Sequence, residues 1–252
     1  MTPEFLELSG GIKIAFHRTE GAGPGVLFCG GYDSNMQGNK ALYLQNLCID
    51  AGWQYTRFDY QGHGESSGKL ADGGISTWAA DALAVLDTVC VGPQIVVGSS
   101  MGGWIATLLS EQRPSKVAGL LGIASAPDFT EELIWNNLDA DTRTALQEGG
   151  SWHRPNRYQP ESPHPVTMAF IDSGRQCRVL DKALAWNGPV RLLHGLNDVD
   201  VPASLSQRLL ERLNSEDARL VLVKQADHRF SSAAELALVG QQLHELREIC
   251  SV

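Results

Sequence analysis

The sequence predicts an α/β fold in which a mostly parallel sheet is covered by helices on both faces. Short apolar runs alternate with helical stretches along most of the 252 residues, a pattern typical of parallel strands buried on both sides. Hydrophobic residues make up 43% of the chain and charged residues 19%, which is an ordinary globular composition. We therefore expect one domain spanning residues 1–252.

The first elements are predicted from turn residues and apolar runs. Gly10 and Gly11 separate two strands at residues 5–8 and 13–17, which indicates a hairpin. A third strand covers residues 25–29. The helix that follows, at residues 39–51, ends before Gly52, since glycine is the residue that most often terminates a helix.

The rest of the chain repeats the alternation of strand and helix. A helix at residues 77–89 places its apolar side chains on one face. A buried strand at residues 94–98 runs directly into a turn rich in glycine and serine, behind which another helix begins. Ser232 and Glu235 form a capping box that opens the last helix. The other predicted strands are at residues 55–60, 117–123, 190–193 and 219–223.

The alternation stops between residues 126 and 188. This stretch is rich in proline and contains three of the six tryptophans, among them Trp135 and Trp152. A long insertion at one end of a parallel sheet favours an inserted helical lid over the strand ends rather than a second fold. We expect Trp135 and Trp152 to contact substrate. The alternative is a structural loop with a small core of its own.

Ser100 is the candidate nucleophile. It is the central residue of a G-x-S-x-G motif at residues 98–102, between a buried strand and a helix, and this context makes the motif specific. The sharp turn requires glycine on both sides and pushes the hydroxyl into the open. It also places the hydroxyl at a helix N-terminus, which favours developing negative charge. A glycine- and serine-rich turn without chemistry is the weaker interpretation.

His228 is the candidate base, because a neutral serine needs one to become a nucleophile. It lies between the last strand and the last helix, and the order nucleophile, acid, base places the base there. His244 lies inside the last helix and lacks the second histidine of a zinc-binding H-E-x-x-H motif. His194, at a strand end, and His63 are interpreted as structural.

Two aspartates are candidates for the acid that orients His228. Asp198 and Asp200 both follow the strand at residues 190–193. Either could accept a hydrogen bond from the imidazole, and the other could cap the helix that begins near Ala203. The residues alone leave this choice open.

The oxyanion of an acyl-transfer intermediate needs two preset N–H donors. We expect Met101, the residue after Ser100, to supply one. We expect Tyr32, which follows Gly30 and Gly31 beyond the third strand, to supply the other. The two glycines are also compatible with a plain strand-to-helix turn.

Charge and cysteine content exclude other classes of protein. The net charge is −9 and no basic cluster is present, so we expect no nucleic-acid partner. The five cysteines are widely spaced and form no C-x-x-C motif, which argues against a disulfide framework and a zinc site. We expect no metal or cofactor.

No apolar run reaches the roughly 20 residues of a membrane span, and no secretory signal is recognisable, so we expect a cytoplasmic protein.

Together these motifs resemble the α/β-hydrolase superfamily over essentially the whole chain. Several stretches narrow the resemblance to a group of mitochondrial palmitoyl-protein thioesterases and acyl-glucuronide esterases with their bacterial relatives; these stretches are residues 32–36 with 40–41, 57–60, 98–104, 191–195 and 227–229. The resemblance implies a triad of Ser100, Asp198 and His228, and so Asp198 rather than Asp200. It also implies acyl esters or thioesters as substrates. The superfamily usually has His-Gly where this chain has Gly30 and Gly31, and the group's targeting segment has no counterpart.

The leading expectation is a hydrolase that cleaves small-molecule carboxylic esters or thioesters through an acyl-Ser100 intermediate. One alternative is a C–C bond hydrolase or an aminopeptidase on the same triad, for which Glu131 and Glu132 could hold a substrate amine. Another is a non-catalytic small-molecule receptor that keeps the triad. The fold alone does not decide among them.

Overall fold

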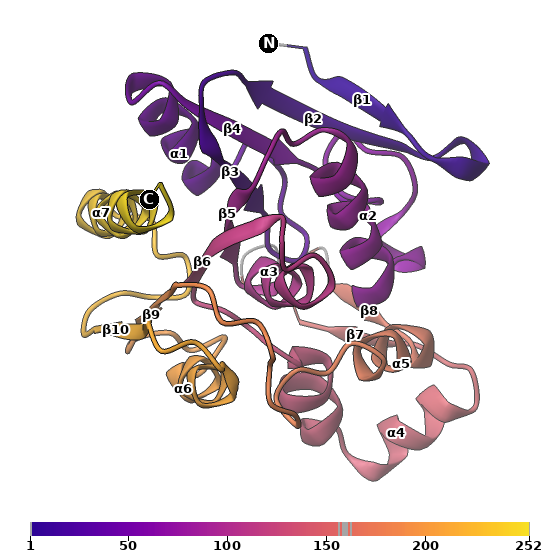
Figure 1. Ribbon diagram of the computed structural model, residues 1–252. Coiled ribbons are helices and arrows are strands. Elements are labelled where there is room, and N and C mark those ends of the chain that lie inside the picture. The colour runs from indigo at the N-terminus through magenta and orange to yellow at the C-terminus, as the bar shows by residue number, and fades with distance from the viewer. Residues whose placement is uncertain (1, 156, 158–160, 162, 252) are drawn as a thin grey trace.

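The computed structural model of the protein describes residues 2–155, 157, 161 and 163–251. Figure 1 shows a twisted sheet between two layers of helices. In the described residues the strand order is β1-β2-β4-β3-β5-β6-β9-β10; β2 is antiparallel to both neighbours, and all other pairs from β4 to β10 are parallel. The strands are β1 (Glu4–Glu7), β2 (Lys13–Thr19), β3 (Ala22–Cys29), β4 (Trp53–Phe58), β5 (Gln94–Ser99), β6 (Val117–Ile123), β9 (Val190–Gly195) and β10 (Ala218–Val223). The predicted fold class is confirmed.

Helices cover both faces of the sheet (Figure 1). On one face lie α1 (Asn39–Asp50) and α7 (Ala233–Cys250), and on the other lie α2 (Ile75–Thr88), α3 (Met101–Gln112) and α6 (Ala203–Arg212). Among the helices of residues 2–155 and 163–251, none is both long and apolar enough to span a bilayer.

The central strand β5 explains why the sequence shows continuous apolar runs. Every residue from Gln94 to Ser99 is buried. Successive side chains of a strand point to opposite faces, so Ile95 and Val97 pack under α1 and α7 while Val96 packs under α2 and α3. A strand covered on both sides must therefore be apolar throughout, and its carboxyl end leads directly to Ser100.

Two predicted helix ends agree with the local geometry. Gly52 follows α1 with φ +68°, and its N–H donates to the carbonyl of Ile49 at 3.1 Å; such a left-handed conformation favours glycine. At the start of α7, the Ser232 hydroxyl accepts from the N–H of Glu235, whose carboxylate accepts from the N–H of Ser232. This reciprocal pair is the predicted capping box.

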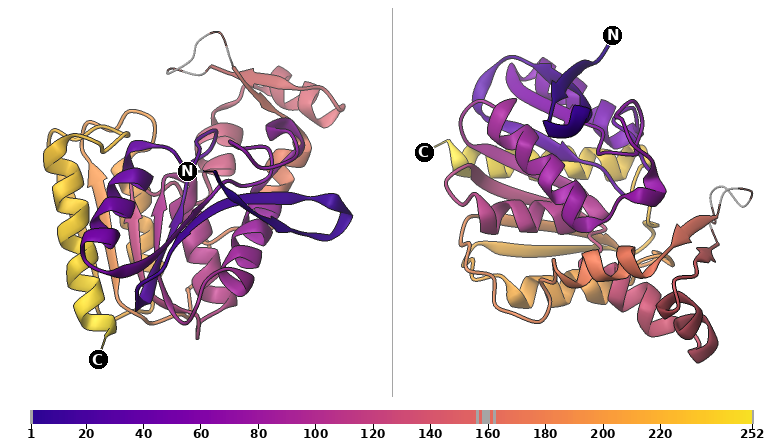
Figure 2. Two further views of the ribbon diagram at one scale, coloured as in Figure 1. Left: turned by 90° about the horizontal axis from the view of Figure 1, so that it is seen from above. Right: turned by 90° about the vertical axis from the view of Figure 1, so that its right-hand side faces the viewer.

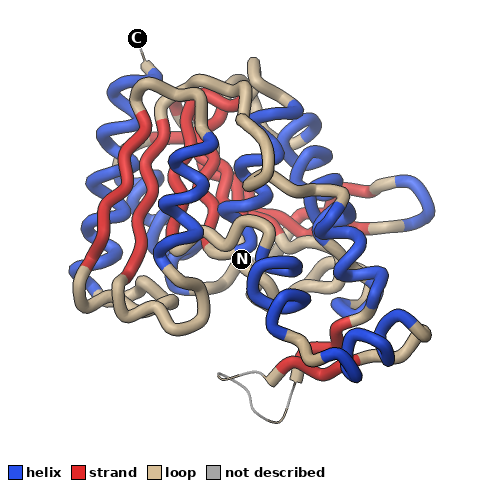
Figure 3. Tube along the Cα trace, turned by 90° about the horizontal axis from the view of Figure 1, so that it is seen from below, coloured by secondary structure: helices blue, strands red, loops and turns tan. Residues whose placement is uncertain are grey.

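The stretch from 126 to 188, called the insertion below, connects β6 to β9. Figures 2 and 3 show that its helices and hairpin project beyond the body, at the end of the sheet where the parallel strands terminate. It is not purely helical as expected, because it also contains a hairpin. Its proline Pro160 and residues 156, 158, 159 and 162 lie outside the described residues. Its elements are a π-helical turn (Thr130–Ile134), a 3₁₀ turn (Trp135–Asn137), α4 (Ala140–Gln147), β7 (Trp152–Arg154), β8 (His164–Val166) and α5 (Met168–Arg175).

The last part of the insertion runs back along the body. This return is required because β6 and β9 are parallel, so the chain must travel from the carboxyl end of one to the amino end of the other. The buried carboxylate of Asp128 accepts from the N–H groups of Val179 and Leu180 at 2.9 and 3.0 Å. The carboxylate of Glu111 on α3 accepts from the N–H of Trp186 at 2.9 Å. These bonds fix the returning segment to the start of the insertion and to α3 of the body.

Candidate active site

Ser100 lies at a strained turn between β5 and α3. Its backbone has φ +55° and ψ −118°, a conformation that non-glycine residues rarely adopt and that is concentrated at functional sites. The strand and helix meet so closely that a Cβ on Gly98 would lie 2.2 Å from the carbonyl oxygen of Gly102. A Cβ on Gly102 would lie 2.0 Å from the carbonyl oxygen of Cys29. Only glycine fits at these two positions, as the motif requires.

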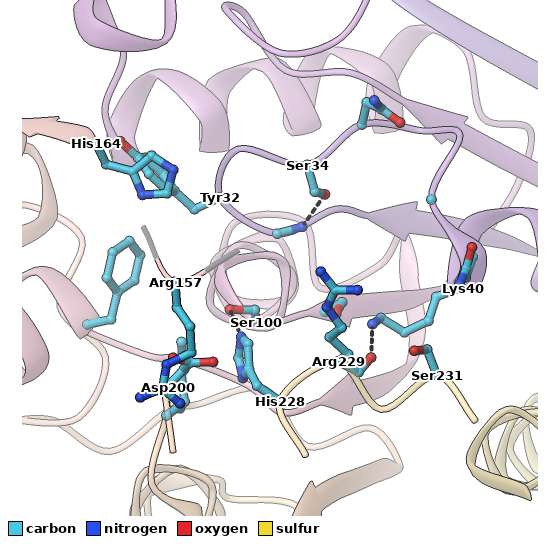
Figure 4. A pocket seen from close by; sticks show the side chains of 18 of the residues that line it. Tyr32, Ser34, Lys40, Ser100, Arg157, His164, Asp200, His228, Arg229 and Ser231 are labelled. Carbon is cyan, nitrogen blue, oxygen red and sulfur yellow. Dashed lines mark hydrogen bonds between the residues drawn. The ribbon is translucent and has the colours of Figure 1, made fainter. Parts of the chain in front are cut away.

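Ser100, His228 and Asp198 form one chain of hydrogen bonds. Figure 4 shows the side chains of Ser100 and His228 pointing toward one another, and His228 Nε2 is 3.1 Å from Ser100 Oγ. On the other side of the ring, His228 Nδ1 is 2.7 Å from Asp198 Oδ2. A nitrogen that faces a carboxylate carries the hydrogen, so Nε2 presents its lone pair to the serine hydroxyl. This is the arrangement in which an imidazole can take the serine proton.

The carboxylate of Asp198 is fully buried and receives hydrogen bonds on both oxygens. Oδ1 accepts from the N–H groups of Asp200 and Val201 at 3.0 and 2.8 Å. Oδ2 accepts from His228 at 2.7 Å and lies 3.2 Å from Nε2 of His194. Burial alone would raise the pKa of this carboxyl, but the bonds from His194, His228 and the backbone outweigh it and hold the pKa well below its usual value. The group is therefore an anion near neutral pH.

Asp200 contributes its backbone, and not its side chain, to this hydrogen-bonded chain. Its carboxylate lines the cavity beside Arg154. Burial lowers the pKa of Arg154 and the negative charge of Asp200 partly compensates. Asp198, and not Asp200, is thus the aspartate that the structure brings to His228.

The loop after β3 passes next to Ser100. A Cβ on Gly31 would lie 3.4 Å from the Ser99 carbonyl oxygen and 3.5 Å from Ser100 Cβ, so the loop at Gly31 packs against the turn that carries the nucleophile. Ser34 fixes this turn, because its hydroxyl accepts from the N–H of Gly31 and its own N–H donates to the Gly31 carbonyl. Met101 is the first residue of α3, so its N–H has no partner within the helix. Met101 and the loop that carries Tyr32 thus adjoin Ser100, and their role as oxyanion donors stays a prediction.

A second loop holds this one in place. The N–H of Asp33 donates to Nε2 of the buried His63 at 3.2 Å, while His63 Nδ1 donates to the carbonyl of Gln61 at 3.1 Å. Burial lowers the pKa of His63, in keeping with a neutral ring that accepts at one nitrogen. The buried carboxylate of Asp59 accepts from the N–H of Met36 at 2.6 Å. The sequence indicated only that His63 is structural, and its actual partner is the loop that carries Tyr32.

A cavity of about 480 Å³ opens above Ser100, within the range of roughly 300–1,000 Å³ of small-molecule sites. Figure 4 shows it extending to both sides of Ser100 and His228. On one side it is bordered by Tyr32, His164, Arg157 and Asp200, and on the other by Ser34, Lys40, Arg229 and Ser231. The apolar Phe129 and Leu133 also line it.

Lys40 is a cavity residue for which the sequence gave no signal beyond its place in the resemblance. Its ammonium group donates to the carbonyl of Arg229, the residue after His228. Burial lowers the pKa of Lys40 to about 8. The side chain thus joins the start of α1 to the loop that carries His228.

The tryptophans expected to contact substrate lie elsewhere. Among the described residues that line the cavity, neither Trp135 nor Trp152 is present. Trp135 packs under the guanidinium groups of Arg143 and Arg175, whose Cζ atoms are 5.4 and 4.7 Å from its ring centroid. Trp152 lies in β7 and packs against the core. The apolar side chains that the insertion gives to the cavity are instead Ala126, Phe129, Leu133 and Pro155.

The acidic pair considered for a substrate amine is engaged in ion pairs. Glu131 binds Arg175 at 2.8 Å and Glu132 binds Arg208 at 2.8 Å, and neither lines the cavity among the described residues. Nothing in this arrangement favours recognition of an amine. Across the described ranges, no group of three or more His, Cys, Asp and Glu side chains is placed to hold a metal ion.

Comparisons with known proteins agree with this geometry. A family model described as the alpha/beta hydrolase fold matches residues 26–159. A rat protein named palmitoyl-protein thioesterase ABHD10, mitochondrial, is 37% identical over 90% of this chain and 76% of its own length. The mitochondrial name contradicts the cytoplasmic location expected from the sequence. That expectation is wrong because composition and the N-terminal residues, on which it rested, do not determine the compartment.

Two solved structures are similar over nearly the whole chain. The alpha/beta hydrolase domain-containing protein 10 from mouse superposes with a TM-score of 0.91 at 36% identity, covering 98% of both chains. A putative hydrolase from Agrobacterium vitis S4 also gives a TM-score of 0.91 at 36% identity, covering 98% of this chain and 100% of the other. The resemblance inferred from the sequence is confirmed.

Proposed function

The chain belongs to the α/β-hydrolase fold family, and on that premise we propose that it is a serine hydrolase that cleaves carboxylic esters or thioesters through an acyl-Ser100 intermediate. One observation carries the proposal. It is the continuous hydrogen-bonded chain from Ser100 Oγ through the His228 ring to the buried Asp198 carboxylate. A strained serine backbone and a buried charge both destabilise the folded protein, so their presence together supports a catalytic role.

In the first half of the proposed reaction, Ser100 Oγ attacks the substrate carbonyl carbon while His228 Nε2 takes the hydroxyl proton. The resulting imidazolium is stabilised by the Asp198 anion on its other nitrogen. The N–H groups of Met101 and Tyr32 donate hydrogen bonds to the carbonyl oxygen and stabilise the negative charge that develops on it. The imidazolium then gives its proton to the departing alcohol or thiol, and the acyl group remains on Ser100.

In the second half, water replaces the departed group. His228 takes a proton from the water as the water oxygen attacks the acyl carbonyl carbon. The same N–H groups again donate hydrogen bonds to the oxyanion. Collapse of this intermediate releases the carboxylic acid and returns the proton to Ser100. Each proton taken by His228 is given back, so the cycle needs no cofactor.

Thioesters are the substrates to test first. The rat and mouse relatives are named palmitoyl-protein thioesterases, and a thiol is a good leaving group that needs little protonation. The aminopeptidase alternative is less well supported, because Glu131 and Glu132 are held in ion pairs with arginines.

The test is a panel of p-nitrophenyl esters and acyl-CoA thioesters of graded chain length, with Ser100→Ala as the control. We expect turnover on part of the panel, acyl transfer to Ser100 detectable by mass spectrometry, and neither with the variant. Labelling of Ser100 by a fluorophosphonate without turnover on any substrate would favour a non-catalytic receptor. Turnover that survives Ser100→Ala would refute the proposal.

A further inference from the structure

We propose that His194 is a positioning residue for the acid of the triad, and that Ser206 holds His194 in the tautomer this role requires. The inference rests on the proposed function, since it extends the chain Ser100–His228–Asp198 by two members. Neither residue touches the cavity in the described part of the chain, so neither acts on substrate directly.

The five side chains follow one another in close contact, and the three at the inner end are fully buried. His194 Nε2 is 3.2 Å from Asp198 Oδ2, the same oxygen that His228 Nδ1 approaches to 2.7 Å. On the other side of its ring, His194 Nδ1 is 2.7 Å from Ser206 Oγ on α6. His194, Ser206 and the carboxylate of Asp198 are all 0% exposed. These three groups are therefore shielded from solvent.

The partners of His194 assign its hydrogen. Nε2 faces two acceptors, the Asp198 carboxylate and the carbonyl of Val201 at 2.9 Å, so a hydrogen must lie on Nε2. In the neutral ring Nδ1 is then an acceptor. Its partner among the described residues is the Ser206 hydroxyl at 2.7 Å, which must donate. Ser206 therefore selects the tautomer of His194 that carries its hydrogen on Nε2, as Asp198 selects the tautomer of His228 that carries its hydrogen on Nδ1.

The consequence concerns the orientation of Asp198. One oxygen of its carboxylate is fixed by two backbone N–H groups, and the other is shared by the two histidines. Without the donor at residue 194, Oδ2 would keep His228 as its only side-chain partner and could rotate with it. The proton transfer to His228 depends on a correctly oriented Asp198, so we expect a loss of about 10- to 100-fold in kcat, which corresponds to about 1.4–2.7 kcal/mol.

Substitutions at residue 194 separate this role from packing. His194→Gln keeps an N–H donor near the position of Nε2, and an amide donates without help from Ser206. His194→Leu has a similar volume and no donor. We expect His194→Leu to lower kcat by about 10- to 100-fold with KM nearly unchanged, and His194→Gln to recover most of that loss. The matched control is His244→Gln and His244→Leu on α7, which should leave kcat unchanged.

A double-mutant cycle tests the part assigned to Ser206. Ser206→Ala should lower kcat several-fold when residue 194 is histidine, and should have little further effect when it is glutamine. Equal losses in both backgrounds, or equal losses in His194→Gln and His194→Leu, would overturn the proposal and leave packing as the role of both residues. Melting temperatures of all variants report folding, and the Gln variant keeps the test decisive if the Leu variant does not fold.

Nuclear magnetic resonance tests the inference without turnover. In protein labelled with ¹⁵N-histidine, His194 should be protonated on Nε2 only, and Ser206→Ala should mix the two tautomers. The downfield proton of the His228–Asp198 bond should shift in His194→Leu and persist in His194→Gln. If the wild type hydrolyses nothing and Ser100 is not acylated, the proposed function fails. A His194 ring protonated on Nδ1 instead refutes the inference, whatever the activity.

Discussion

The carboxyl edge of the sheet and the insertion border the same cavity in different ways. At the edge, Asp198 is fully buried and His228 keeps only 17% of its side chain exposed, and both have partners from neighbouring loops. The insertion contributes Arg154, His164 and Arg157, which are partly or fully exposed and charged or titratable, beside a few apolar side chains. The first region fixes the reacting atoms through buried hydrogen bonds, whereas the second presents more exposed side chains to the cavity.

The comparison predicts that residues at the edge determine turnover and that residues of the insertion determine substrate preference. Substitutions at the edge should change turnover for every substrate alike, because the same groups act on every acyl carbonyl. Substitutions in the insertion should change the ratio between substrates. Variants in the two regions can test that division.

The strongest test is the nucleophile itself. Ser100→Ala should reduce kcat by about 10⁴- to 10⁶-fold on all substrates, since only binding and the oxyanion donors remain. Ser99→Ala, its neighbour in sequence, should keep most activity. Initial rates on one short and one long acyl ester measure both. A Ser100→Ala enzyme that loses activity on one chain length only would break the division between the regions.

The next test compares the two aspartates of one loop. Asp198→Asn should reduce kcat by about 10⁴-fold with little change in KM, because an amide can hold the wrong imidazole tautomer. Asp200→Asn should cost less than about tenfold, since the carboxylate that His228 contacts is that of Asp198 and not that of Asp200. Steady-state kinetics on a single ester distinguish them. The reverse order would mean that the carboxylate acting in solution is that of Asp200.

A third test concerns the apolar part of the insertion. Leu133 borders the cavity, whereas Leu138 is packed in the same insertion away from it. Leu133→Ala should reduce the preference for long over short acyl chains by about tenfold, which corresponds to losing contact with about two methylene groups at ~0.8 kcal/mol each. Leu138→Ala should leave that ratio unchanged. Equal effects of the two variants on that ratio would indicate that the insertion is structural and does not select the acyl chain.

The smallest effect is on stability and depends on pH. The pKa of Asp198 is lower in the folded protein than the ordinary value of about 3.9. Its stabilising contribution is therefore present above about pH 4 and is lost as the pH falls toward the folded pKa. Urea unfolding of wild type and Asp198→Asn should give a constant difference between pH 5 and 7 that narrows below pH 4. Asp172→Asn in the insertion removes one exposed partner of Arg175 and should change stability by less than ~1 kcal/mol at any pH.

The parts of the fold that sequence predicted are those encoded locally. The run from Gln94 to Ser99 and the capping box at Ser232 carry their own signals, because strand burial and helix caps depend on neighbours in the chain. The turn at Ser100 was predictable for the same reason. Its two glycines are required by contacts that any strand, turn and helix of this kind would make.

The remaining parts depend on contacts between distant segments. Asp198 and Asp200 have the same sequence context, and only the bend of their loop decides which one reaches His228. His194 looked like a residue of a strand end, because its bond to Ser206 exists only once α6 has packed on the sheet. The insertion has no regular period, so its sequence did not indicate that Leu133, and not Trp135, borders the cavity.

The returning segment of the insertion has a consequence for how such enzymes diversify. Residues 177–188 are bound to Asp128 at the start of the insertion and to Glu111 on α3, and they form the crossover that two parallel strands require. The stretch a lineage can lengthen, shorten or exchange is therefore narrower than the whole insertion, and runs from about Thr130 to Arg175. Grafting that stretch between homologues, with the crossover retained, should transfer substrate preference onto an unchanged catalytic frame.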